Sequence, residues 1–213
     1  MSVAIDVVSD VVCPWCFIGK RKLERALELD ASGAEVPVNW HPFQLNPDMP
    51  AEGVSRADYL MKKFGAAGGG SNYDRVRAAG AAVGIEFAFD RIVRQPNTLA
   101  AHALIAIAAE RGCQGDMVEA IFCAYFLEGK DIGDREVLTA LATPLDMGAD
   151  DVERALTDES VRAMTREADE RARAMGVQGV PFFIFDQRLA VSGAQDPEVL
   201  VGAMRQAARD RKA

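Results

Sequence analysis

The chain has 213 residues, of which 49% are hydrophobic and 26% charged, as is usual for a globular protein. Its formal net charge of -8 repels phosphate backbones and anionic lipid surfaces, which argues against nucleic acid and membrane partners. Asp6 and Asp10 interrupt the apolar run that a signal peptide needs, and no apolar stretch approaches the roughly 20 residues that cross a bilayer. We therefore expect a cytoplasmic protein.

The beginning of the chain alternates strand and helix patterns. Residues 3–8 form a short β-branched run that predicts a buried strand. Cys-Pro-Trp-Cys comes after it, and a helical apolar pattern runs from residue 17 to about residue 29. Residues 33–37 are expected to turn the chain into a second short strand at residues 36–40.

From about Pro42 the pattern changes to helix and loop for roughly a hundred residues. Pro42, Pro47 and Pro50 break regular structure at its start, and residues 65–70 predict a flexible connection. Helical patterns and their caps predict helices over residues 55–64, 72–83, 98–111, 115–128, 135–142 and 151–156.

The last part of the chain returns to mixed elements. A charged helix is expected over residues 159–175, followed by strands at 182–185 and 189–191 and a helix at 196–209. The whole order is that of an α/β thioredoxin fold interrupted by an all-helical insertion. We expect residues 1–44 and 157–213 to form the thioredoxin-like domain and residues 45–156 the inserted helical domain.

The Cys-Pro-Trp-Cys motif stands where a helix begins, which suits redox chemistry. A thiol attacks disulfides only as thiolate, and the free N–H groups and positive dipole end of a helix favour ionisation of Cys13. Cys16 lies one helical turn further on, within reach of a disulfide with Cys13. Pro14 suits the first helical position because no N–H is needed there. Cys13 is thus the candidate nucleophile and Cys16 the candidate resolving cysteine.

Two other interpretations of the motif stay open at this point. Zinc usually takes four ligands, and the remaining cysteines, Cys113 and Cys123, do not form a second close pair, so we expect no metal. A structural or accidental pair is also compatible with a lone CxxC. Cys113 and Cys123 are interpreted first as free thiols, with an accessory redox role as the alternative.

The chain resembles the DsbA family of thioredoxin-like oxidoreductases, and more closely its FrnE branch. The resemblance rests on stretches spread over nearly the whole chain, which are SDVVCPWCFIGK, PFQLNPDMPAEG, QPNTLAAHALI and GVQGVPFFIFDQRLAVSGAQ. It implies a DsbA-like fold, protein disulfide oxidoreductase activity, and a cis Val180-Pro181 bond facing the active-site cysteine. The sequence alone would favour an ordinary trans proline.

Glutathione enters through the same resemblance. Related kappa-class glutathione transferases and 2-hydroxychromene-2-carboxylate isomerases bind glutathione and typically carry serine where this chain has Cys13. By analogy, glutathione would lie along Val180 as a co-substrate, with its γ-glutamyl carboxylate near a helix N-terminus. The residues concerned are Ala194, Gln195 and Asp196, for which the simpler interpretation is a turn and helix cap.

Four further side chains are candidates for supporting or substrate-binding roles. Asp10, three residues before Cys13, is a candidate proton acceptor, with a turn residue as the alternative. His102 faces the cleft in related sequences, although a lone histidine among alanines is more often structural. Trp15 is expected to be partly exposed, where it can contact substrate. Phe43 is a candidate wall of the groove, with a core position favoured.

Three functions remain for comparison. The first is a thiol-disulfide oxidoreductase or isomerase acting on a disulfide-containing protein or small thiol, with no bound cofactor. The second is a glutathione-dependent isomerase or transferase acting on a small aromatic or polyketide-like substrate. The third is a peptide-binding module with incidental thiols. The sequence leaves monomer and homodimer open.

Overall fold

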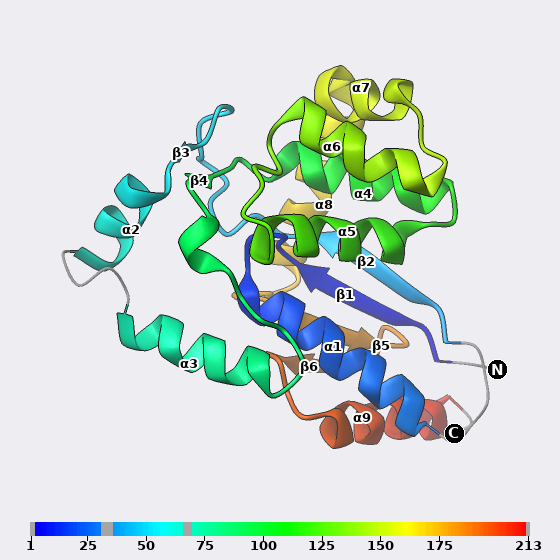
Figure 1. The fold of residues 1–213 in the computed structure, drawn as a ribbon. Coiled ribbons are helices and arrows are strands. Elements are labelled where there is room, and N and C mark those ends of the chain that lie inside the picture. The colour runs from blue at the N-terminus through cyan, green and yellow to red at the C-terminus, as the bar shows by residue number, and fades with distance from the viewer. Residues whose placement is uncertain (1–2, 31–35, 66–69, 212–213) are drawn as a thin grey trace.

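A computed structural model describes residues 3–30, 36–65 and 70–211 (Figure 1). The predicted turn at 33–37 and connection at 65–70 fall mostly outside these residues. A four-stranded sheet of order β2-β1-β5-β6 lies at the centre. Strand β1 pairs parallel to β2 and antiparallel to β5, and β5 pairs antiparallel to β6. The strands are β1 (Ile5–Ser9), β2 (Val38–Pro42), β5 (Phe182–Phe185) and β6 (Leu189–Ser192).

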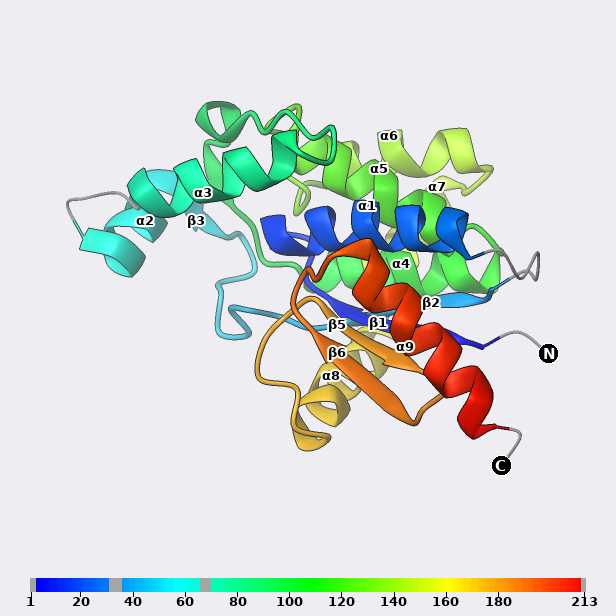
Figure 2. The ribbon, with the colours of Figure 1, turned by 90° about the horizontal axis from the view of Figure 1, so that it is seen from below.

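Strand β1 is buried on both faces because helices cover the sheet on each side. Its alternate residues Ile5 and Val7 belong to the main hydrophobic core, whereas Val8 belongs to a smaller buried cluster with Ala172 of helix α8. Figure 2 shows α1 and α8 on opposite sides of the sheet. Helix α9 contacts α1 and β6. These helices are α1 (Pro14–Leu29), α8 (Glu159–Ala174) and α9 (Pro197–Asp210).

The helical part lies between β2 and α8 in the sequence. Helix α4 is apolar almost all round and contacts α5, α7 and α8, so it occupies the interior of the molecule (Figure 1). Helices α2 and α3 lie apart from this group, toward the start of α1 (Figure 1). The helices are α2 (Arg56–Phe64), α3 (Gly70–Ala81), α4 (Leu99–Glu110), α5 (Gln114–Phe126), α6 (Arg135–Ala142) and α7 (Ala149–Thr157).

The stretch between Pro42 and residue 156 is helix and loop almost throughout, as predicted, but it also contains a short strand pair that the sequence did not predict. Strands β3 (Val54–Ser55) and β4 (Arg94–Gln95) form a separate antiparallel pair. Two residues are too few to show a period of two, so the sequence pattern carries no signal for them. Gly53 permits the close approach, because its φ is +69° and a Cβ there would lie 2.5 Å from the carbonyl oxygen of Gln95.

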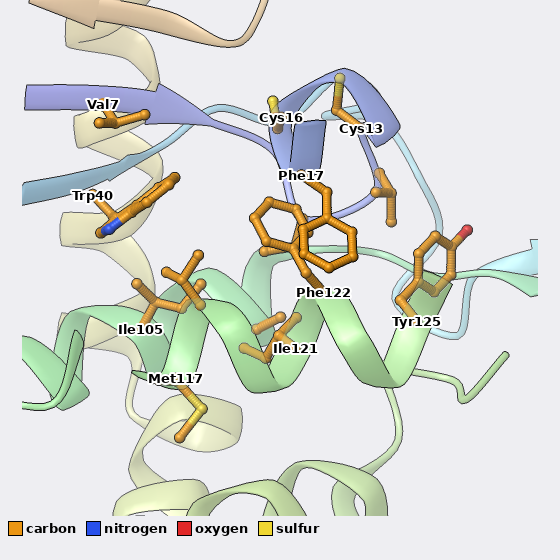
Figure 3. Close-up of a cluster of buried hydrophobic side chains, with 14 of the residues drawn as sticks. Val7, Cys13, Cys16, Phe17, Trp40, Ile105, Met117, Ile121, Phe122 and Tyr125 are labelled. Carbon is orange, nitrogen blue, oxygen red and sulfur yellow. The ribbon is translucent and has the colours of Figure 1, made fainter. Parts of the chain in front are cut away.

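An aromatic cluster joins α1 to the helical part. Phe17 stacks on Phe122 of α5, with ring centroids 5.1 Å apart (Figure 3). Phe17 also stacks against Phe126. Phe87 packs edge-on against both Phe17 and Phe126. Buried aromatic pairs of this kind contribute about 0.5–1.5 kcal/mol beyond the burial of their area. The first turn of α1 is therefore held firmly against the helices that surround it.

None of the helices in the described part of the chain is both long and apolar enough to cross a membrane.

Candidate functional site

The first turn of α1 places the two cysteines of the motif. Cys13 is the N-cap residue, with extended backbone angles, and Pro14 takes the first helical position as predicted. The N–H of Cys13 donates to the carbonyl oxygen of Asp10 at 3.0 Å, which closes the turn between β1 and α1. Both sulfur atoms point to the same side of this turn (Figure 3). Both are free thiols.

The segment before β5 lies directly against Cys13. The Cys13 thiol donates to the carbonyl oxygen of Val180 at 3.6 Å, and the Val180-Pro181 peptide bond is cis. Gly19 of α1 lies close to the ring of Pro181. A Cβ at Gly19 would be only 2.9 Å from Cγ of Pro181. A side chain at position 19 would push this segment away from the cysteine. The structure therefore brings Cys13, Val180 and Pro181 together.

The two thiols have different surroundings. Cys16 is 1% exposed, and its burial, together with hydrogen bonding to Cys13 and the negative charge that Cys13 can carry, raises the pKa of Cys16 well above its usual range. Ser9 and the backbone of Asp10 act in the opposite direction but more weakly. Cys16 thus keeps its proton under conditions in which an ordinary cysteine begins to ionise.

Cys13 is buried as well as Cys16. Only 5% of its surface is accessible, and its thiol lies against the carbonyl oxygen of Val180. It nevertheless lines a cavity of about 390 Å³ between the first turn of α1 and helices α2 and α3, whereas Cys16 does not line it. Access to the Cys13 sulfur is therefore through this cavity rather than from an open surface.

The cavity wall combines apolar and cationic side chains. Trp15 is partly buried there, in agreement with its predicted partial exposure. The lining residues are Val12, Cys13, Pro14, Trp15, Leu45, Arg56, Tyr59, Lys63, Phe64, Tyr73, Arg75, Val76, Gly179 and Val180. Among the described residues, this set holds three cationic side chains and no carboxylate.

Asp10 and His102 meet beneath the motif, although they are distant in sequence. Asp10 is fully buried, and one carboxylate oxygen lies 3.3 Å from Nε2 of His102 while the other accepts the N–H of Leu45 at 2.8 Å. His102 is 4% exposed. The carboxylate of Asp10 thus joins α4 and the segment after β2 to the turn that carries Cys13.

The remaining predicted substrate-binding residues do not line the cavity. Phe43 is buried in the small cluster with Val8, and the Arg173 guanidinium lies over its ring. Its position is that of a core residue, the interpretation that the sequence favoured for it.

The segment before α9 faces α1 instead of the cavity. The Lys22 ammonium donates to the carbonyl oxygen of Ala194 at 3.1 Å and to the Asp196 carboxylate at 2.8 Å. The hydrogen bond from Lys22 to Asp196 and the charge of Lys22 lower the pKa of Asp196. The Gln195 side chain donates to the carbonyl oxygen of Ser192 at 2.9 Å. Ala194 and Asp196 thus hold this segment against α1, and Gln195 hydrogen-bonds within it.

Cys113 and Cys123 are partly buried and lie outside the cavity. The Cys123 thiol donates to the Glu119 carboxylate at 3.2 Å, and burial together with that carboxylate raises the pKa of Cys123 to about 12. Burial raises the pKa of Cys113 as well. Neither environment favours a reactive thiolate. Among the described residues, no three His, Cys, Asp or Glu side chains gather as metal ligands would.

Sequence reasoning missed the cationic and aromatic residues of the cavity that come from α2 and α3. Arg56, Tyr59, Lys63, Tyr73 and Arg75 carry no motif, and they meet Cys13 only through the tertiary fold. Their helices were predicted, but the position of these helices beside the motif was not.

Comparison with known proteins places nearly the whole chain in one family. A family model described as the DSBA-like thioredoxin domain matches residues 4–205. The crystal structure of the probable DsbA oxidoreductase SCO1869 from Streptomyces coelicolor is 30% identical, covers 96% of this chain and 89% of that chain, and superposes with a TM-score of 0.86. The uncharacterized protein YwbO of Bacillus subtilis (strain 168) is 28% identical over 205 residues, 96% of each chain.

A more distant structure shares the fold alone. That of a 2-hydroxychromene-2-carboxylate isomerase is 13% identical, covers 98% of each chain and has a TM-score of 0.72. The same fold thus serves a different reaction, so the residues around the cysteines have to carry the functional argument. The family match and the site agree that the chain belongs to the DSBA-like thioredoxin domain family and is an enzyme of the thiol-oxidoreductase kind.

Proposed function

We propose that this protein catalyses thiol-disulfide exchange with Cys13 as the nucleophile and Cys16 as the resolving cysteine. One observation carries the proposal. Within the motif, Cys13 lines a cavity, while Cys16 is buried behind it and its pKa is raised by burial and by Cys13 itself. The two sulfurs are therefore distinguished before any substrate arrives.

In the first step the Cys13 thiolate attacks one sulfur of a substrate disulfide. A bond forms between Cys13 and that sulfur, the substrate disulfide breaks, and the other substrate sulfur leaves as a thiolate. The carbonyl oxygen of Val180, 3.6 Å from the Cys13 sulfur, belongs to the segment along which the substrate chain would lie. Glutathione is a candidate thiol for the reverse exchange.

In the second step Cys16 loses its proton and attacks the Cys13 sulfur. The substrate leaves as its second thiolate, and the Cys13–Cys16 disulfide remains, so the substrate gains two electrons and the protein loses two. Asp10 is proposed to accept the proton of Cys16, because its buried carboxylate accepts the N–H of Val12 beside the motif at 3.5 Å while its backbone lies against Cys16. His102 would hold that carboxylate in position from α4.

The test is insulin reduction with dithiothreitol as the electron donor, measured for the wild type, Cys13→Ser and Cys16→Ser. We expect turnover to be lost in Cys13→Ser, and in Cys16→Ser to be lost or to stop at a trapped mixed disulfide. Cys123→Ser is the matched control, since a serine hydroxyl can still donate to Glu119 and the position lies outside the cavity. Full insulin turnover by Cys16→Ser would contradict the resolving role of Cys16. A glutathione-dependent isomerase activity, in contrast, would survive in Cys16→Ser, because isomerisation needs no resolving cysteine.

A further inference from the structure

The cavity beside Cys13 differs in charge from the rest of the molecule. The chain as a whole is acidic, with a formal net charge of -8, yet the charged side chains of the cavity wall are Arg56, Lys63 and Arg75. Several arginines elsewhere in the fold pair with carboxylates, as Arg21 does with Glu119. Within the part of the chain that the structure describes, no carboxylate belongs to this wall, although Lys63 also borders a neighbouring hollow lined by Asp48 and Asp58. A wall whose charges are all positive is a recognition feature for an anion.

Arg56 is the best-positioned of the three cations. Its guanidinium donates to the Tyr73 hydroxyl at 2.5 Å, to the Tyr125 hydroxyl at 3.4 Å, and to the side-chain carbonyl of Gln95. All three acceptors are neutral, and within residues 3–30, 36–65 and 70–211 no carboxylate pairs with Arg56. The side chain is thus partly buried and fixed in direction, while its charge is not neutralised.

The other two cations lie over aromatic rings of the same wall. Arg75 lies over Trp15, with 5.6 Å from its guanidinium carbon to the ring centroid, and the Lys63 ammonium lies over Tyr59 and Phe64. These contacts hold positive charge at the border of an apolar surface. An occupant would therefore meet ring faces and cations together.

The size of the cavity favours a small molecule over a protein as the substrate. A cavity of about 390 Å³ lies in the range of small-molecule sites, which is roughly 300–1,000 Å³. Cys13 forms part of its wall and is only 5% exposed, so a disulfide has to enter the cavity to be attacked. A compact disulfide enters more easily than one within a folded protein.

We propose that the cavity selects a small disulfide with an aromatic or apolar body and a carboxylate, and that Arg56 binds the carboxylate with help from Lys63 and Arg75. The inference rests on the proposed exchange chemistry and names its substrate class. The Cys13 thiolate attacks the nearer sulfur of the bound disulfide, a Cys13-substrate disulfide forms, and the other half leaves as a thiolate. Attack by Cys16, after loss of its proton, releases the second thiolate.

The test compares two aromatic disulfides that differ in charge. One is 5,5'-dithiobis(2-nitrobenzoate), whose rings carry carboxylates, and the other is the neutral 2,2'-dithiobis(5-nitropyridine). Each reagent is mixed with the wild type and with Cys13→Ser, and the fast phase seen only in the wild type gives the second-order rate constant for the reaction of Cys13. The measured quantity is the rate constant for the charged reagent divided by that for the neutral reagent. This ratio cancels changes in the intrinsic reactivity of the thiol.

We expect Arg56→Gln to lower this ratio roughly tenfold, the effect of losing a hydrogen bond to a charged group. Because Arg56 also holds Gln95 and two tyrosines, the exposed Lys63→Gln and Arg75→Gln variants give a second test, with an expected decrease of about threefold each. Lys62→Gln is the matched control: it removes one positive charge from the same helix, but Lys62 lines a neighbouring hollow instead. Its ratio should stay unchanged.

An unchanged ratio in Arg56→Gln, Lys63→Gln and Arg75→Gln would overturn the inference. The inference would also be overturned if Arg56→Gln slowed the reaction of Cys13 with an acidic peptide disulfide but not with the nitrobenzoate, because the cavity would then bind a peptide. The exchange chemistry itself is read separately, from formation of the Cys13–Cys16 disulfide with either reagent. If neither reagent forms that disulfide, the proposed function fails, whatever the ratio.

Discussion

Substitution of Gly19 by alanine tests the packing that positions the Pro181 segment against the motif. In a helix interior, alanine is favoured over glycine by about 1 kcal/mol. The new Cβ at position 19 would lie 2.9 Å from Cγ and 3.3 Å from Cβ of Pro181, and 3.2 Å from Cζ of Phe183. A proline ring cannot turn away as a flexible side chain can, and overpacking of this kind costs about 1–3 kcal/mol. We expect Gly19→Ala to lower the free energy of unfolding by about 1 kcal/mol.

The control is Gly202→Ala in α9, where a Cβ would meet no atom within 4 Å. Only the helix preference acts there, so this variant should be more stable than the wild type by about 0.5–1 kcal/mol. Urea unfolding followed by circular dichroism measures both free energies of unfolding. If Gly19→Ala proves as stable as Gly202→Ala, the contact between α1 and Pro181 is not close, and the reasoning fails.

Two further predictions concern the charges around Glu119. Burial raises the pKa of Glu119, but hydrogen bonds from Arg21 and Lys20 outweigh burial and lower it from 4.5 to about 2. The ionised Glu119 therefore stabilises the fold fully above about pH 4.5, and this contribution is lost as the pH falls toward 2. After allowance for partial exposure, Glu119→Gln should lower the free energy of unfolding by about 1–2 kcal/mol at pH 7, as measured by urea unfolding. The difference between wild type and variant should become smaller between pH 4.5 and 3. A difference independent of pH would contradict this assignment. Burial and Glu119 raise the pKa of Cys123 to about 12, so iodoacetamide at pH 8 should label Cys123 slowly in the wild type and faster in Glu119→Gln. Peptide mass mapping measures the two labelling rates, and equal rates would contradict the role of Glu119.

Elements with a strong local signal could be predicted from the sequence. Helix α6 begins and ends where its pattern predicted, at Arg135 and Ala142, and strand β5 covers residues 182–185 as predicted. Helix α1 begins at Pro14, the position predicted for a first helical residue, three residues before the apolar pattern that starts at residue 17. These elements depend on periodicity, caps and proline positions, which a sequence displays directly.

Features that depend on contacts between distant segments could not be predicted from the sequence. The pairing of β3 with β4 joins residues about 40 apart in sequence, and the contact of Asp10 with His102 joins residues 92 apart. The low exposure of Cys13 and the cationic wall around Arg56 arise from the placement of whole helices. The motif identified the sulfur chemistry, whereas the surroundings that select a substrate required the fold.

The most direct measurement of the central claim is the position of a trapped mixed disulfide. Cys16→Ser is incubated with oxidised glutathione, and the adduct is located by peptide mass mapping. The account predicts one glutathione on Cys13 in Cys16→Ser, no stable adduct in the wild type, which closes the Cys13–Cys16 disulfide instead, and none at Cys16 in Cys13→Ser. The account would be contradicted if glutathione adducts formed on Cys113 or Cys123 as fast as on Cys13, or if an adduct formed on Cys16 in Cys13→Ser.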